Sequence, residues 1–462
     1  MSQRQNRSGH SRRGLAMVMA LAMTTVLVSL AVAMVSVTVL NLHMSDNVQK
    51  VSRARLAAES GLAQMCLVLR NIQLPVDMTP DTMAADIQAA LSERMNVAPV
   101  LSATAPATVM LPAVDLGTSS YTCAFTPIDG QSCRLLIEGT SSGVSRWVSM
   151  RLRCVRRRSV IFNHGVSSRG KIVIKGSAHV EGVLRPSDAS VLSTCDQPVA
   201  IEAGGHATVD GDLYIAGEDI NAVWLTGGAL SIGGADGLDE IYSQHVHVGT
   251  TGAEFPQTDT SPFAALATNV IDGNSDTSGT TYSNIRIKAG TNPTFNSDTV
   301  INGMIYVEAP NKVTFNGTCT VNGIIATADG SSYPTSDCLL AFSGNMDAPG
   351  VDALPDLPEY AAVKALTGTA LLAPGFSAEF KGSSNGFNGV IAADQISFLG
   401  NSGISGEVKG TIVGLGDRDM VLSGNASIRI RGADSDAPPA GFIQPWGLDV
   451  DGGSYEEPVN GL

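Results

Sequence analysis

One apolar stretch near the N-terminus constrains this chain more than any other feature. Residues 15–40, LAMVMALAMTTVLVSLAVAMVSVTVL, carry no charge. As a helix rising about 1.5 Å per residue they would measure about 39 Å, enough to cross a bilayer core of about 30 Å with some tilt. A cleaved secretory signal has a shorter apolar core, of roughly 7–15 residues. We therefore expect a retained membrane-spanning or fibre-core helix over 15–40.

The residues before this stretch are basic. Arg4, Arg7, Arg12 and Arg13 lie in a leader over 1–14 that contains no acidic residue. The excess of positive charge on the cytoplasmic side of membrane proteins predicts a cytoplasmic N-terminus and an exported remainder. An ordinary uncleaved signal anchor is the alternative interpretation.

The helical pattern continues beyond residue 40. Apolar side chains recur there at spacings of three, four or seven, at Met44, Val48, Val51, Ala58, Leu62, Met65 and Leu69. No proline occurs before Pro75. We expect one helix from about Leu15 to about Arg70, whose second half is amphipathic and packs on a globular domain.

A short basic leader, a glycine, an unbroken apolar helix and the element ARLAAESGL at 54–62 resemble type IV pilin-like proteins. The resemblance is to PilX-type minor pilins and pilus-assembly proteins, and it extends to about residue 70. It implies cleavage by the prepilin peptidase after Gly14, which would leave Leu15 as the new N-terminus. It also implies an inner-membrane location, possible assembly into a surface pilus, and three partners: other pilin-like subunits, the inner-membrane assembly machinery and membrane lipid.

One position departs from that family. The fifth residue of a mature major pilin is normally glutamate, whereas this chain has Met19. A buried carboxylate needs a partner, and in the family it is thought to offset the N-terminal ammonium of an adjacent subunit. The resemblance therefore indicates a minor or tip-located subunit, or one that does not polymerise in bulk. Glu59 lies too late for that role, so we expect it to be a surface charge or the i+4 partner of Arg55.

Residues 41–158 are expected to form a small α+β domain around the amphipathic helix. The segment 79–96 has helix-start residues and apolar positions every four residues. Strand-like runs follow at 121–126, 133–139 and 144–155, and the last alternates between apolar and polar residues. A long helix on an antiparallel meander is also what the pilin resemblance implies.

The chain has seven cysteines, without a CxxC pair or a Cys/His ligand spacing, so we expect no zinc. Cys123 and Cys133 flank the turn sequence PIDGQ, which would bring them together across a hairpin as a disulfide. That both are small buried side chains is an equally open interpretation.

Residues 159–433 contain an irregular repeat of apolar, small and glycine positions. Copies lie at 174–184, 203–213, 295–305, 315–325 and 398–408, and partial copies elsewhere. Two of them begin about 20 residues apart, the length of one turn of a parallel β-helix. We expect a mainly-β domain that is a right-handed parallel β-helix, with a β-sandwich as the competing fold. Its expected corners, where glycine would supply a positive φ, are Gly182, Gly211, Gly303, Gly323, Gly389 and Gly406.

Two stretches depart from the repeat. Residues 352–368 are marked by proline and partly helical in pattern, which suits a loop or a cap. Residues 434–462 are acidic and rich in proline and glycine, so we expect a flexible tail.

Candidate chemical sites are few. His245 and His247 share a strand face, but no third metal ligand can be identified, and we expect solvent-facing side chains. The segments 272–279 and 449–453 lack the terminal glutamate of a calcium loop and are expected to be turns. Glu379, Asp394 and 417–419 could share a groove, as paired carboxylates do in polysaccharide-active enzymes, but no motif selects them. We expect no enzyme activity, no metal and no cofactor.

The net charge of -14 makes nucleic acid a poor partner. The sequence predicts a membrane-anchored, pilin-like structural, assembly or adhesion protein of a type IV pilus or a type II secretion-like system. Its extracytoplasmic β-helical domain would meet a glycan or another surface ligand. The alternatives are a membrane-tethered polysaccharide-active enzyme and a polymer-forming scaffold.

Overall fold

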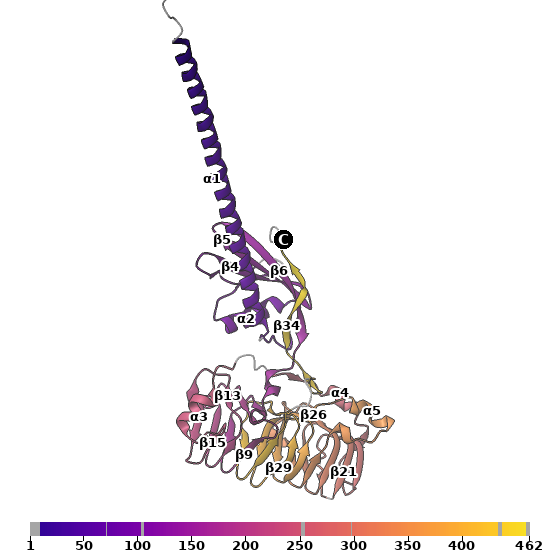
Figure 1. Ribbon diagram of the computed structural model, residues 1–462. Coiled ribbons are helices and arrows are strands. Elements are labelled where there is room, and N and C mark those ends of the chain that lie inside the picture. The colour runs from indigo at the N-terminus through magenta and orange to yellow at the C-terminus, as the bar shows by residue number, and fades with distance from the viewer. Residues whose placement is uncertain are drawn as a thin grey trace, which may run out of the picture. The chain divides into compact units, whose positions relative to one another are not determined.

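The computed structural model describes residues 10–70, 72–102, 106–250, 255–296, 298–432 and 437–458 (Figure 1). The chain divides into two compact units, which are described separately. The first, called here the N-terminal unit, comprises residues 1–70, 79–154 and 448–462. The second, called the parallel domain, comprises residues 71–78 and 155–447.

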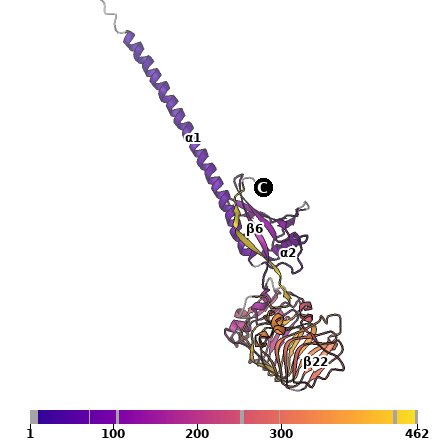
Figure 2. The ribbon, with the colours of Figure 1, turned by 90° about the vertical axis from the view of Figure 1, so that its right-hand side faces the viewer.

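A single helix opens the N-terminal unit. α1 (His10–Leu69) runs without a break (Figures 1 and 2). Every side chain from Leu15 to Gln49 is exposed. From Lys50 onward one face becomes buried, with Ala54, Ala58 and Met65 fully inaccessible to solvent. The expectation of one long helix that is exposed in its first half and packed in its second is confirmed.

The second half of α1 packs on an antiparallel sheet. Two glycines allow the close approach: a Cβ on Gly139 would lie 2.1 Å from the carbonyl oxygen of Ala54, and one on Gly61 would lie 2.6 Å from the Tyr121 ring. α2 (Met83–Met95) adds buried apolar side chains to the same core. The sheet order is β1 (Val100–Leu101), β2 (Val109–Met110), β4 (Ser120–Asp129), β5 (Ser132–Ser141), β6 (Val144–Arg156) and β34 (Trp446–Glu456), with β3 (Val114–Asp115) also paired to β4.

The pairing of β34 corrects the expectation of a flexible tail. This strand is hydrogen-bonded to β6, at the end of the sheet. Polar side chains reinforce the pairing: Arg153 lies 2.7 Å from Asp451, and the Ser454 hydroxyl accepts a hydrogen bond from the Arg151 backbone amide. An exposed edge strand gains backbone partners when another strand is added, which outweighs the low hydrophobicity of the segment. Residues 433–436 and 459–462 lie outside the described part of the tail.

The parallel domain is built from strands stacked in three columns, and its pairings are parallel throughout the large sheet. The first column contains β18 (Asn269–Ile271), β19 (Thr281–Ile287), β21 (Thr299–Val307), β23 (Cys319–Thr327), β26 (Thr369–Phe380), β28 (Val390–Phe398), β30 (Ile412–Gly414), β7 (Val166–Ser168), β10 (Val191–Ser193), β13 (Leu213–Ile215) and β16 (Val246–His247). We call a layer one strand of this first column together with the strands of the other two columns that follow it in the chain.

The other two columns complete each layer, and the long strands of the first column bend into them. The second column contains β20 (Thr294–Phe295), β22 (Asn311–Phe315), β24 (Cys338–Phe342), β31 (Met420–Leu422), β8 (Ile172–Ile174), β11 (Ile201–Gly204) and β14 (Val223–Thr226). The third contains β25 (Met346–Ala348), β27 (Ser383–Phe387), β29 (Gly403–Val408), β32 (Ser427–Ile430), β9 (His179–Gly182), β12 (Thr208–Val209) and β15 (Ser231–Ile232).

The chain enters this stack in its middle. β7, the first strand, pairs with β10 on one side and with β30, from the last layer, on the other. The chain therefore builds outward from β7 to β16, resumes at β18 at the opposite end, and builds back to β30. The repeat in the sequence does not reveal this order, because it does not say which copies become neighbours.

The interior of the stack is a continuous apolar core. In the second column the rings of Phe295, Phe315, Phe342, Phe380 and Phe398 stack with centroid separations of 5.4, 5.2, 4.8 and 4.6 Å. Stacked aromatic pairs contribute about 0.5–1.5 kcal/mol each beyond the burial of their area. On the outside, Asn322 donates a hydrogen bond to Asn302 of the preceding layer at 2.9 Å, a ladder that fixes the register.

A second apolar cluster covers the outer side of the first column. It includes Phe162, Phe263, Tyr360 and Phe442 and packs over outward side chains such as Leu372. These covering residues come from connecting segments, among them η1 (Val160–Asn163), α4 (Ser261–Ala264), α5 (Ala361–Lys364) and the antiparallel pair β17 (Gln257–Thr258) with β33 (Phe442–Ile443). Residues 352–368, expected to be a loop or a cap, belong to this cover. Near β16 lies the short helix α3 (Leu238–Gln244).

The six glycines expected at corners fall into two groups. Gly303, Gly323 and Gly389 have positive φ values of 89°, 149° and 132°. The premise of a positive φ does not hold at Gly182, Gly211 and Gly406.

Close approach of the backbone explains the second group of glycines. A Cβ on Gly406 would lie 1.3 Å from the carbonyl oxygen of Asn385, and one on Gly182 would lie 2.2 Å from that of Arg185. A Cβ on Gly211 would lie 2.5 Å from the backbone nitrogen of Ser190. Glycine is needed there because a neighbouring stretch of backbone leaves no room for a side chain.

Candidate functional site

The first half of α1 is the first candidate surface. From Leu15 the helix is long and apolar enough to cross a membrane. Its most apolar stretch of 18 residues has a mean hydropathy of 2.4, and no part of that stretch is buried. Gly14, Leu15 and Met19 lie within this unbroken helix, and the side chains of Leu15 and Met19 are exposed. Cleavage after Gly14 stays a prediction. Residues 1–9 of the leader lie outside the described part of the chain.

Glu59 lies in the packed half of α1 and is the i+4 partner of Arg55, as expected. The Arg55 Nε donates a hydrogen bond to the Glu59 carboxylate at 3.0 Å. Arg55 also binds Glu457 from the C-terminal segment at 2.6 Å. Glu59 therefore serves a local ion pair at the surface of the N-terminal unit.

Of the two open interpretations of Cys123 and Cys133, the strand register does not support the disulfide. Cys123 of β4 lies opposite Ile137, whereas Cys133 of β5 lies opposite Pro127. The two thiols are offset by four positions along the ladder, about 13 Å at the rise of a strand, far beyond disulfide reach. Both are free and buried, and burial raises the pKa of each thiol to about 12.

A second candidate surface surrounds Asp212, at the start of β13. His245 lies beside Asp212 in the next layer, and its Nδ1 is 2.8 Å from Asp212 Oδ1. His247 Nε2 is 2.9 Å from the other carboxylate oxygen. The expectation of solvent-facing histidines holds for His247, whose side chain is 42% exposed, but not for His245, whose side chain is 20% exposed. Burial alone would raise the pKa of Asp212, but the hydrogen bonds from both histidines outweigh it and lower that pKa.

The ring of Tyr214 joins these histidines to a pocket. It stacks on His247, with centroids 4.6 Å apart, and on its other side meets His164 at 4.8 Å. Burial lowers the pKa of His164 to about 4, so this ring is neutral at physiological pH. The pocket measures about 450 Å³ and is lined also by Asp188 and Asp210. The described residues contain no group of three or more His, Cys, Asp or Glu side chains arranged to hold a metal ion.

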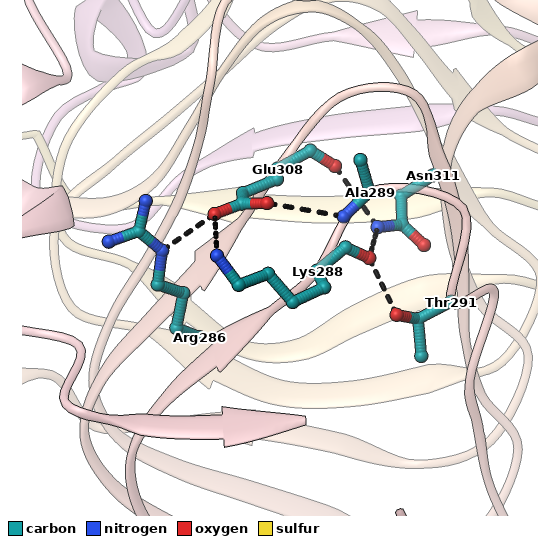
Figure 3. A network of polar contacts seen from close by, with 6 residues as sticks. All are labelled: Arg286, Lys288, Ala289, Thr291, Glu308 and Asn311. Carbon is teal, nitrogen blue, oxygen red and sulfur yellow. Dashed lines mark hydrogen bonds and ion pairs between the residues drawn. The ribbon is translucent and has the colours of Figure 1, made fainter. Parts of the chain in front are cut away.

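A polar network links β19 to the turn after β21 (Figure 3). The Glu308 carboxylate accepts hydrogen bonds from Arg286 Nε at 2.7 Å, Lys288 Nζ at 2.9 Å and the Ala289 backbone amide at 3.3 Å. Burial would raise the pKa of Glu308, but the bonds from Lys288 and Arg286 outweigh it and lower it. Both oxygens are already engaged, so this network holds two layers together rather than offering a reactive carboxylate.

The third candidate surface is a polar cleft, called here the Asp394 cleft. It measures about 600 Å³ and lies where several first-column strands turn. Its lining includes three carboxylates, the cleft carboxylates Asp329, Asp394 and Asp417, and two guanidinium groups, the cleft arginines Arg169 and Arg418. Arg169 follows β7, and Asp394 lies within β28. The cleft therefore combines side chains from widely separated parts of the sequence.

Asp394 forms the half-buried floor of this cleft. Its Oδ1 accepts a hydrogen bond from the Gly375 backbone amide at 3.0 Å. Burial raises the pKa of Asp394, the Asp329 charge adds to that effect, and the bond from Gly375 and the charges of the cleft arginines oppose it. A half-buried carboxyl with a raised pKa is a group that ligand sites commonly use.

The sequence located part of this cleft. Of the carboxylates considered as a possible group, Asp394 and Asp417 do line one cavity. Glu379 lies elsewhere, 2.6 Å from Lys381. The range 417–419 also contains Arg418, which lines the cleft, whereas sequence reasoning missed Asp329 and Arg169. The signal for Arg169 is its position: Arg169 and Leu415 directly follow β7 and β30, which pair in register. That signal can be used only when the first layer is known to pair with the last.

Comparison with known proteins does not assign a function to these surfaces. No family model matches the chain, and no curated protein matches it. Among solved structures it is similar to the competence-associated pilin ComZ from Thermus thermophilus, with 13% identity and a TM-score of 0.26 over 88% of this chain and 97% of that one. A TM-score of that size does not establish a shared fold, so the function below rests on the residues of this chain.

Proposed function

We propose that this chain is a membrane-anchored, pilin-like structural or adhesion protein that displays the parallel domain outside the inner membrane. One observation carries the proposal: α1 is wholly exposed and apolar from Leu15 through residue 40, whereas its second half packs on its own sheet. An apolar helix that its own chain leaves uncovered needs lipid or neighbouring helices around it. Other pilin-like subunits and the assembly machinery of a type IV pilus or type II secretion-like system are the proposed neighbours.

We further propose that the parallel domain is a right-handed parallel β-helix. Three features support this assignment: columns of parallel strands, a layer spacing near that of the repeat, as in Thr299 beside Cys319, and inward stacks of like side chains. A rod of this kind has a long lateral surface. That geometry suits display and contact with a surface ligand.

The processing site tests the anchor. The chain would be expressed in a bacterium with its pilus machinery, and the mature protein from the membrane fraction sequenced from its N-terminus. We expect it to begin at Leu15, and a Gly14→Val variant to keep the leader. A Gly9→Val variant is the matched control and should be processed like the parent. A parent chain that keeps Met1 would overturn the pilin-like assignment in favour of a simple signal anchor.

A polysaccharide-active enzyme is the second candidate function. The observation that favours it is the half-buried Asp394 with further carboxylates in one cleft, since glycoside hydrolysis uses two carboxyl groups. Release of reducing ends from neutral and acidic polysaccharides by the purified full chain would support this candidate, provided that Asp394→Asn abolishes it. We propose display without catalysis, and expect no release.

A further inference from the structure

The Asp394 cleft has the features of a prepared binding site. At its floor, Gly416 has no positive φ, yet a Cβ there would lie 3.0 Å from the carboxyl carbon, from Oδ2 and from the backbone carbonyl oxygen of Asp394. Any side chain at Gly416 would therefore crowd the carboxyl group. Glycine at this position leaves room for both the backbone and the carboxyl group of Asp394.

The rim of the cleft supplies charged groups that are not paired with one another. Asp329, Asp417 and both cleft arginines are exposed, and within the described residues none of them forms an ion pair at salt-bridge distance. Arg169 is held with its guanidinium 5.2 Å from the centre of the Phe255 ring. A side chain ordered before binding loses less freedom when a ligand arrives.

The charge of the cleft indicates the class of ligand. Three carboxylates face two guanidinium groups, so the site has no excess of positive charge, and the whole chain carries -14. A phosphate or a polyuronate would be repelled. Hydroxyl groups, in contrast, both donate to carboxylates and accept from guanidinium groups, so a molecule with many hydroxyls can satisfy both kinds of side chain at once.

The size and place of the cleft narrow the class further. About 600 Å³ falls within the range of roughly 300–1,000 Å³ that is usual for small-ligand sites. The lining combines strand residues, such as Asp394 of β28 and the two residues of β17, with residues that follow strands. β17 is only two residues long, which is too short to pair with an extended peptide along its length. Its walls are mostly polar, which disfavours an apolar ligand.

We propose that the Asp394 cleft binds an uncharged oligosaccharide, whose hydroxyl groups pair with the cleft carboxylates and the cleft arginines. This inference gives a ligand class to the proposed display role and rests on it for its biological meaning. The binding itself does not depend on cleavage at Gly14, so the two can fail separately.

The test uses the full chain in a detergent without a sugar headgroup. Maltotetraose, cellotetraose and chitotetraose are the neutral probes, tetragalacturonate is the acidic probe, and saturation-transfer NMR and calorimetry report binding. We expect at least one neutral probe to bind and tetragalacturonate to bind more weakly. Arg418→Ala should weaken the neutral probe about tenfold or more, because a hydrogen bond to a charged group contributes about 1.5–3 kcal/mol. Gly416→Val should also weaken it, because the added side chain would crowd the Asp394 carboxyl group.

A matched control separates the cleft from general effects. Asp196 is exposed in the loop between β10 and β11 and does not line the cleft, so Asp196→Asn should bind as the parent does while Asp329→Asn does not. Binding of none of the neutral probes, equal binding by the cleft variants, or preference for tetragalacturonate would each overturn the proposal.

Discussion

Two apolar parts of this molecule end in opposite surroundings. From Leu15 to residue 40 the side chains of α1 are exposed along their whole length, whereas the inward side chains of the parallel domain are buried almost completely. The difference lies in how each structure supplies neighbours. Each layer of strands covers the next, but a lone helix has no second copy of itself in the chain. Apolar side chains in the parallel domain are therefore buried by neighbouring layers of the same chain. Apolar side chains in the first half of α1 can be buried only by lipid or by other protein chains.

The largest loss of stability should come from removing one ring of the phenylalanine stack. Phe342 is 1% exposed and stacks on Phe315 and Phe380. Phe342→Ala should lower the free energy of unfolding by about 3–5 kcal/mol, because it leaves a cavity inside the stack. Urea unfolding of the full chain in detergent, followed by circular dichroism, measures it.

Leu339, on the same strand, is the matched control because its side chain is only partly buried. Leu339→Ala should cost clearly less. Equal losses at the two positions would mean that the ring stack is not what stabilises these layers.

A charge in the exposed half of α1 should act on the membrane and leave folding unchanged. Val28 is 62% exposed in the centre of the apolar stretch. Val28→Arg should weaken insertion by about 2.5–3.5 kcal/mol, the cost of arginine at the middle of a spanning helix. The measurement is the fraction of chain that resists carbonate extraction from membranes.

Val48 offers the control for this change. It is 68% exposed, lies on the same helix, and is separated from the apolar stretch by His43 and Asp46. Val48→Arg should leave extraction as in the parent. If Val28→Arg also extracts like the parent, the first half of α1 does not lie in lipid.

The fold was only partly readable in the sequence. The long helix and the strand spacing in 295–325 follow from local periodicity, which side-chain burial dictates residue by residue. The insertion of β7 between β10 and β30 depends on which copies of the repeat become neighbours. The copies are too similar in sequence to indicate which pairs form. The same holds for β34, whose polar sequence gives no strand signal yet gains the hydrogen bonds of β6.

The candidate sites were likewise predictable only where they depend on local sequence, and not where they depend on which layers pair. Asp394 and Asp417 are separated in sequence by about the length of one layer, so the repeat allowed a shared groove to be proposed for them. Arg169 joins them only because the first layer pairs with the last. The hydrogen bonds of Asp212 with His245 and His247 likewise depend on a loop that returns the chain one layer later.

Acid should destabilise the parallel domain through His164. Burial lowers its pKa from 6.5 to about 4. Between these values the unfolded chain takes up a proton that the folded chain does not, so stability falls as the pH falls through this range. The gap corresponds to up to about 3 kcal/mol. Unfolding free energies between pH 7 and 4 measure the slope, and His164→Phe, which keeps a ring beside Tyr214, should reduce it. An unchanged slope would assign the acid sensitivity to other groups.

The smallest expected loss of stability concerns Gly406. It tests whether glycine is needed there for a positive φ or for close approach of the backbone. Gly406 has no positive φ, but a Cβ there would lie 1.3 Å from the carbonyl oxygen of Asn385 in the neighbouring layer. Gly406→Ala must therefore push two layers apart, and we expect a loss of about 1–3 kcal/mol. Gly228 has no positive φ either, and a Cβ added there would meet nothing within 4 Å, so Gly228→Ala should stay within about 0.5 kcal/mol. Both are read from the same urea unfolding. If Gly406→Ala unfolds with the parent, the layers yield locally, and close backbone contact is not what glycine provides at that position.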